Sequence, residues 1–177
     1  MKRILAVVCS VALCAVPGFA QTHHHAAAGP AMSDQDFVNA AAQIDMVEAN
    51  LGQLAQDSAS SDDVKSYAQT LATDHTNDFA QLHSVAQQAN LTVPDSIDTA
   101  HNKAMIAPFQ KLHGAAFDHK YVMDMIAGHT KAIALFKKES MDAQNPAVKT
   151  YAEADLPTLE KHLEGAKDLV KSGAKKK

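Results

Sequence analysis

The sequence predicts an all-α protein, a ferritin-like four-helix bundle with one long crossover between the second and third long helices. Four segments carry apolar side chains at the three- and four-residue spacing of an amphipathic helix, and none reads convincingly as a strand. Short turns join the first segment to the second and the third to the fourth, which predicts two antiparallel hairpins. A helix of about 25 residues spans about 37 Å, and about 11 extended residues cover that length. The longer middle connection can therefore run from one end of the bundle to the other.

The first predicted hairpin comprises residues 33–58 and 60–89. Each helix begins at a serine, Ser33 or Ser60, that is followed three residues later by an aspartate, which is a capping-box-like pattern. The apolar face of each helix should turn toward the core. These faces contain Phe37, Ala41, Ile44, Leu51, Leu54 and Ala55 in the first helix, and Val64, Tyr67, Ala68, Leu71, Phe79, Leu82, Ala86 and Ala89 in the second.

Residues 96–113 form the predicted crossover, with one short helix that is interrupted at Pro108. The third long helix should run over residues 115–141. Asn145 is placed to cap the fourth helix, because Pro146 after it suits the first helical position. The apolar faces contain Phe117, Tyr121, Val122, Met125, Ala132, Ile133 and Phe136 in the third helix, and Val148, Tyr151, Ala152, Leu159, Ala166 and Leu169 in the fourth.

The first 20 residues have the pattern of a secretory signal peptide: two basic residues, a short apolar run and small residues at the end. We therefore expect export to the periplasm. The rest of the chain divides into a His-containing leader (21–32), the bundle domain (33–171) and a basic tail (172–177). Both cysteines lie in the signal, so the mature chain should contain no disulfide and no thiolate metal ligand.

The charge balance argues against nucleic acid as a partner. Two of the 16 basic residues lie in the signal, so 14 basic residues face 20 acidic ones, a net charge of −6. Nucleic-acid binding depends on an excess of clustered Lys and Arg. No segment after the signal is long and apolar enough to span a membrane. The sequence names no protein partner, and a metal ion is a candidate partner of its polar residues.

Each long helix carries ionisable residues within its apolar arc, most of them near mid-helix. These are Glu48 on the first helix, His75 and Asp78 on the second, Asp118 and His129 on the third, and Asp155 and His162 on the fourth. In a bundle such side chains can converge. Imidazole and carboxylate together suit Zn, Fe, Mn or Cu, so these seven residues are candidate metal ligands. Asp74 at the edge of its arc and Tyr121 near Asp118 are candidates for the surrounding shell. The alternative is a buried His–carboxylate network that only fixes helix packing.

A second candidate metal site lies at the predicted mature N-terminus, Gln21-Thr22-His23. A free amine, two deprotonated amides and the imidazole of His23 would offer Cu(II) or Ni(II) a square of four nitrogens, the tetragonal geometry that these ions prefer. The hypothesis depends on cleavage after Ala20 and on a glutamine that has not cyclised. The alternative is a disordered polar leader.

Four stretches resemble the DUF4142 family: VEANLGQLA, ATDHTNDFAQL, FDHKYVMDMIAGHTKAIALFKKES and DLPTLEKHLEGAKDL. The resemblance covers residues 33–171. It implies an exported bacterial protein of ferritin-like four-helix architecture, without a settled biochemical function. The characteristic positions that it implies are Glu48, Asp74, His75, Asp118, Tyr121, His129 and His162. One departure is Gly128, where the family pattern often has Asp; if that Asp helps to hold a metal, the site is weaker here.

The predicted role is that of an exported, non-enzymatic protein that is metal-binding or, by analogy with the family, stress-related. Two alternatives stay open. One is a metal-dependent redox enzyme with an iron or manganese centre; the other is a structural or interaction protein of the envelope with a purely structural polar core. No catalytic residue is predicted, because the chain has neither a nucleophile motif nor the paired Glu-x-x-His pattern of di-iron proteins.

Overall fold

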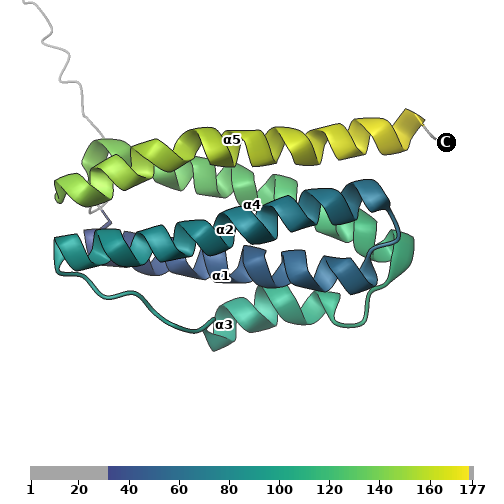
Figure 1. Ribbon diagram of the computed structural model, residues 1–177, viewed down its shortest axis with the longest axis horizontal. Helices are drawn as coiled ribbons and strands as arrows, with labels where there is room; N and C mark the ends of the chain where they lie inside the picture. The colour runs from purple at the N-terminus through teal and green to yellow at the C-terminus, as the bar shows by residue number, and fades with distance from the viewer. Residues whose placement is uncertain (1–31, 176–177) are drawn as a thin grey trace, which may run out of the picture. The chain divides into compact units, whose positions relative to one another are not determined.

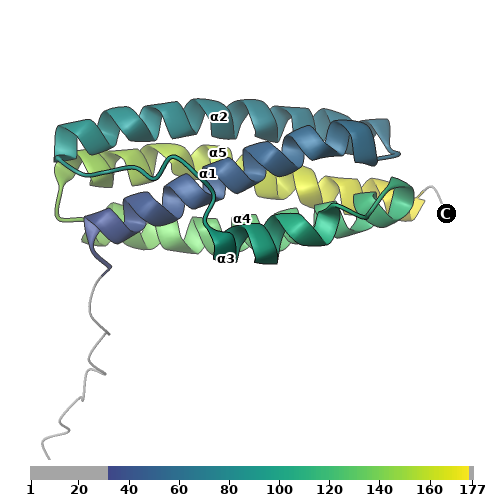
Figure 2. The same cartoon turned by 90° about the horizontal axis from the view of Figure 1, so that it is seen from below.

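Four long helices lie side by side in the computed structural model, which describes residues 32–175 (Figures 1 and 2). They are α1 (Asp34–Ser58), α2 (Asp62–Ala89), α4 (Gly114–Asp142) and α5 (Pro146–Lys175). The described part of the chain contains no strand, so the all-α prediction is confirmed. The predicted signal peptide, nearly all of the leader and the Gln21-Thr22-His23 group lie outside the described residues.

The helices pack as two hairpins. α1 packs along α2 and α4 along α5, and the hairpins meet where α2 packs on α5 and α1 on α4. Between them the chain passes through α3 (Thr99–His101), a π-helical turn η1 (Asn102–Ile106) and a 3-10 turn η2 (Ala107–Phe109). This connection leads from the end of α2 back along the long helices to the opposite end, where α4 begins (Figure 1). As a result α2 and α4 run in the same direction. None of the described helices is both long and apolar enough to span a membrane.

Two of the predicted helix starts are confirmed by their capping bonds. The Ser33 hydroxyl accepts a hydrogen bond from the Asp36 amide at 3.1 Å, and α1 begins at the next residue, Asp34. The Asn145 side chain accepts one from the Ala147 amide at 2.9 Å at the start of α5. A side-chain oxygen thus satisfies an amide that has no partner within its own helix.

The predicted start of α2 is wrong by one residue, because Ser61 rather than Ser60 is the cap. The Ser61 hydroxyl accepts a hydrogen bond from the Val64 amide. Ser60 is engaged elsewhere: its amide and its hydroxyl both donate to the carboxylate of Asp118 on α4, at 3.0 and 2.5 Å. Asp118 on α4 therefore anchors the turn between α1 and α2 through hydrogen bonds.

The core consists of two apolar clusters separated by a polar layer. The Phe37 cluster lies toward the start of α1 and the α4–α5 turn. Its largest buried members are Phe37, Leu82, Phe136, Tyr151 and Leu159. The Phe109 cluster lies toward the α1–α2 turn. Its largest buried members are Leu51, Leu71, Phe109, Phe117, Tyr121 and Met125. Every long helix carries buried ionisable residues between the two clusters. These residues form the polar layer, which contains the candidate site.

Candidate metal centre

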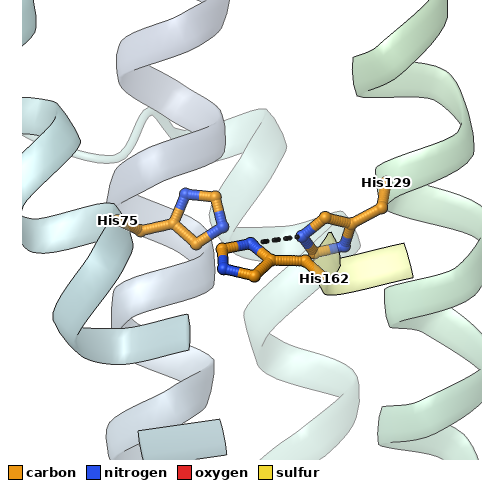
Figure 3. Close-up of side chains that lie close together, drawn as sticks. All are labelled: His75, His129 and His162. Carbon is orange, nitrogen blue, oxygen red and sulfur yellow. Dashed lines mark hydrogen bonds between the residues drawn. The ribbon is translucent and has the colours of Figure 1, made fainter. Parts of the chain in front are cut away.

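Three histidines from three helices meet in the polar layer (Figure 3). His75 on α2, His129 on α4 and His162 on α5 are all buried. One ring nitrogen of each lies within 4.8 Å of one ring nitrogen of both others. Each histidine falls between a residue of the Phe37 cluster and a residue of the Phe109 cluster on its own helix, so the heptad-like spacing of apolar residues fixes its depth in the core.

The outer nitrogen of each ring faces an oxygen acceptor. His129 Nδ1 donates to the Met125 carbonyl at 2.9 Å, and His162 Nε2 donates to the Asp74 carboxylate at 2.9 Å. His75 Nδ1 lies 2.9 Å from a carboxyl oxygen of Asp45. With a proton on the outer nitrogen, the inner nitrogen of each ring carries a free lone pair. Such outer partners fix the tautomer and the orientation of a metal-binding imidazole.

The inner nitrogens of His129 and His162 lie at hydrogen-bond distance, and one of them donates to the other only when its ring carries a second proton. His129 Nε2 and His162 Nδ1 are 3.3 Å apart, and no group in the described residues bonds His75 Nε2. Burial, and next the neighbouring His162, lowers the pKa of His129 to about 4. Burial also lowers the pKa of His75, to which the other two histidines add. A second proton is therefore disfavoured on His75 and on His129 at neutral pH.

The 3.3 Å separation fits two ligands of one metal ion. Zinc binds imidazole nitrogen at about 2.0–2.1 Å, usually with tetrahedral angles. Two nitrogens on such a metal lie about 3.3–3.4 Å apart. The spacing of the His129 and His162 nitrogens thus needs no adjustment, whereas the three nitrogens together lie within 4.8 Å of one another, so the His75 ring would have to move closer to the ion.

Carboxyl groups surround the histidines. Asp45 and Asp74 bind two of the rings, and Asp78 accepts a hydrogen bond from the Tyr151 hydroxyl at 2.6 Å. Burial, and next Asp78 and Asp74, raises the pKa of Asp155 to about 7. Burial likewise raises the pKa of Asp45 and of Asp78, and the charges of Asp78 and Asp155 add to the effect on Asp45. These groups resist carrying charge together unless a cation offsets them.

The structure separates the remaining predicted ligands. Glu48 is buried in the same layer on α1, outside the group of three nitrogens. Tyr121 lies in the Phe109 cluster with its ring stacked on Phe117. Asp118 does not join the site, and its prediction as a core ligand is corrected: its carboxylate binds the α1–α2 turn. It precedes His129 by 11 residues, which is about 16 Å along a helix.

Sequence reasoning missed Asp45, which is buried and binds His75. A signal for it exists. Ala41, Asp45, Glu48, Gly52 and Ala55 repeat at the three- and four-residue spacing of one helix face, and all five are buried. Glu139 was missed as well, but it lies on the far side of the Phe37 cluster, where burial, and next Asp34, raises its pKa.

Comparison with solved structures identifies the fold. The chain resembles a DUF305 fragment from Deinococcus radiodurans with a TM-score of 0.67 and 17% identity, over 81% of this chain and 99% of that one. It also resembles a "putative secreted protein DUF305" from Streptomyces coelicolor, with a TM-score of 0.60 and 13% identity, over 79% of this chain and 93% of that one. At these identities the likeness concerns the fold alone.

The sequence itself matches no curated protein. It does match one family model, whose description is "Domain of unknown function (DUF4142)", over residues 19–169. That range contains all four long helices except the last turn or two of α5, and it contains the three histidines of the polar layer. The chain therefore belongs to the DUF4142 family.

Proposed function

We propose that this protein binds one divalent transition-metal ion through His75 Nε2, His129 Nε2 and His162 Nδ1. The observation that carries the proposal is the convergence of three buried imidazole nitrogens whose opposite nitrogens face oxygen acceptors. A bound ion would join the three inner nitrogens through three coordinate bonds. It would also favour the ionised form of Asp45, because the positive charge offsets the carboxyls around it.

A purely structural network explains less. Buried polar groups in folded proteins nearly always have hydrogen-bond partners. Here His75 Nε2 has no partner among the described residues, although the other nitrogen of the same ring is bonded to Asp45. Leaving such an atom unsatisfied in the core costs stability without adding specificity. A metal ion would satisfy the nitrogen and draw the carboxyl into its ionised form.

The donor set favours zinc, copper or iron over magnesium and calcium, because neutral imidazole nitrogens suit the former and oxygen ligands the latter. Three protein ligands would leave a coordination position for water or another small ligand. In this proposal Asp45 and Asp74 hold two of the rings in place and do not themselves bind the ion.

We also propose that the protein works outside the cytoplasm and that its helices form a ferritin-like bundle. The N-terminal sequence pattern supports export, and one of the structural neighbours carries the description of a secreted protein. The connection that runs the length of the long helices supports the ferritin-like topology (Figure 1).

Titration of the metal-free protein with Co(II) tests the proposed function, since tetrahedral cobalt sites absorb visible light. We expect one ion per chain, and we expect His75→Ala, His129→Ala and His162→Ala each to abolish the spectrum. His119→Ala is the matched control, because His119 is an exposed histidine on the same helix as His129. A chain without residues 21–32 should bind equally well. Binding that survives the three core substitutions, or that disappears with the leader, would contradict the proposal.

A further inference from the structure

A cavity of about 510 Å³ opens on the side of the molecule between α1, α4 and the α3–η1 segment. We call it the lateral cavity. Most of its wall is apolar and is formed by Ile44, Val47, Met105, Ala127, Ala132 and Leu135. Its volume falls within the range of small-molecule sites, which combine apolar walls with a few fixed polar groups. It is far larger than a metal ion requires.

Glu48 supplies the polar group at the inner wall of the lateral cavity. Its side chain is only 5% exposed, and no described group bonds its Oε2 atom. Gly128 lies opposite on α4, where an added Cβ would stand 3.3 Å from Glu48 Oε1. The absence of a side chain at this position leaves room beside Glu48 Oε1. A buried carboxyl without a partner is costly, so its presence in an apolar wall points to a ligand that pairs with it.

The charges around Glu48 favour a cationic ligand. The charge that acts on it is another carboxylate, Asp124, which also lines the cavity and forms an ion pair with Lys120 at 2.6 Å. Burial, and next Asp124, raises the pKa of Glu48 to about 8. An ammonium group would stabilise the ionised carboxylate, whereas a second anion would be repelled. Lys131 lines the cavity too, but it is exposed and makes no ion pair with Glu48 in the structure.

We propose that the lateral cavity binds a small organic amine whose ammonium group pairs with the carboxylate of Glu48 and whose apolar body packs between α1 and α4. The site lies beside the histidines, because His129 contributes to its wall. It is nevertheless distinct from them, since Glu48 stands outside the group of three nitrogens. The proposal does not depend on the metal site.

Three probes of equal length and different head group test it: hexylamine, 1-hexanol and hexanoate. Each would be titrated into isotope-labelled, metal-free protein while backbone amide resonances are followed. We expect hexylamine to bind at least about tenfold more tightly than hexanol, because a hydrogen bond between two charged groups is stronger than one between neutral groups. Hexanoate should bind most weakly. The largest shifts should fall on the amides of Val47 and Gly128.

Two substitutions with matched controls locate the binding. Glu48→Gln should reduce the affinity for hexylamine to the affinity for hexanol. Glu139→Gln is the control, because it makes the same change at another buried glutamate with an unbonded oxygen, and it should leave the preference for hexylamine intact. Gly128→Leu should fill the cavity and weaken all three probes. Gly173→Leu is its control, because a Cβ at Gly173 meets nothing within 4 Å.

Several results would overturn the proposal. They are equal affinity for the three probes, a preference for hexanoate, no binding of hexylamine, or an unchanged preference in Glu48→Gln. If that variant does not fold, Gly128→Leu decides, since unimpaired hexylamine binding there would exclude the cavity. Cobalt-loaded protein should bind hexylamine as metal-free protein does. Binding that requires the metal would place the amine on the ion instead of on Glu48.

Discussion

The two apolar clusters and the polar layer between them are built from the same four helices, but they differ in how well their buried groups are satisfied. In the Phe37 cluster every large side chain finds an apolar partner; Phe37 and Phe136, for example, pack edge to face with centroids 5.0 Å apart. In the polar layer, by contrast, buried groups such as His75 and Glu48 each keep an unbonded atom. Burial of apolar side chains in the clusters thus stabilises the fold, whereas the unbonded polar atoms of the layer destabilise it. Unbonded polar atoms at this depth are more consistent with a binding site than with packing alone.

The clearest test of this comparison lies in the Phe37 cluster, where the largest loss of stability is expected. Phe136→Ala removes a buried ring that contacts Phe37 and Tyr151. We expect a loss of about 3–5 kcal/mol in the free energy of unfolding, from lost burial plus the remaining cavity. Urea denaturation measures it. Met141→Ala on the same helix is the control, because Met141 is 67% exposed and should change stability little. A small loss at Phe136 would mean that this cluster is not a stabilising core.

The corresponding change in the polar layer should have a different signature. Metal-free His129→Leu should unfold within about 1 kcal/mol of the wild type, because an apolar side chain there leaves no buried polar atom of its own. In the presence of zinc at about 100 times its dissociation constant, the wild type should gain about 2.7 kcal/mol and the variant nothing. Urea denaturation with and without zinc makes the comparison. Equal stabilisation of both proteins by zinc would show that the ion binds elsewhere.

The sequence alone could predict the layer because burial and helical spacing are coupled. His75, His129 and His162 fall among apolar residues at spacings of three, four and seven, so an inward direction follows from the pattern. The approximate depth follows from counting turns from each end of a hairpin. The two hairpins could be predicted on the same basis, from short turns and from caps such as Asn145.

The rest could not be predicted because a helical projection loses two kinds of information. It discards the position of a residue along the helix axis. Asp118 faces the core side of its helix, but it lies about 16 Å along α4 from His129 and binds the α1–α2 turn instead. It also fixes only an average inward direction. The buried face of α1 is rotated from the predicted one: Asp45 is buried, whereas Ile44, which was expected to face the core, is only partly buried. α1 packs against α2, α4 and η1, and the sequence of α1 does not contain that geometry.

The pH dependence of stability should distinguish the carboxyl groups of the polar layer from its histidines. The pKa of Glu48 rises from its ordinary 4.5 to about 8 on folding. Between those values the folded chain binds more protons than the unfolded chain, so a rise in pH destabilises the fold. Asp155, with a pKa of about 7, acts in the same direction. His75 and His129 act in the opposite direction, but only below about pH 6.5, since above it they are neutral in both states.

From pH 6.5 to 8 the carboxyl contribution therefore remains alone. Metal-free protein should lose about 1–2 kcal/mol of unfolding free energy over this interval. Glu48→Gln should remove most of the loss, because an amide does not titrate. Urea denaturation at a series of pH values measures both slopes. A wild-type stability that is constant over the interval, or a variant with the same slope as the wild type, would show that Glu48 is ionised in the folded protein and that its surroundings are less apolar than the structure indicates.

The smallest effect is expected at Asp118, and it tests where the polar layer ends. Asp118 accepts hydrogen bonds from the Ser60 amide, the Ser60 hydroxyl and the Ser61 amide, and all three groups lie in the turn that joins α1 to α2. Asp118→Ala should reduce stability by about 1 kcal/mol, the usual effect of losing a side-chain acceptor at a helix start. Cobalt stoichiometry and the cobalt spectrum should not change.

The same variant discriminates between a structural and a ligating carboxylate, because the two roles affect different measurements. A ligand or an orienting group would alter the cobalt spectrum or weaken metal affinity by about 10–100-fold, even where stability changed little. Asp74→Ala provides the comparison, since Asp74 binds His162 directly. We expect Asp74→Ala to weaken metal binding and Asp118→Ala to leave it intact. Weaker binding in Asp118→Ala would extend the site toward the α1–α2 turn, through Tyr121 and the Phe109 cluster that lie between them.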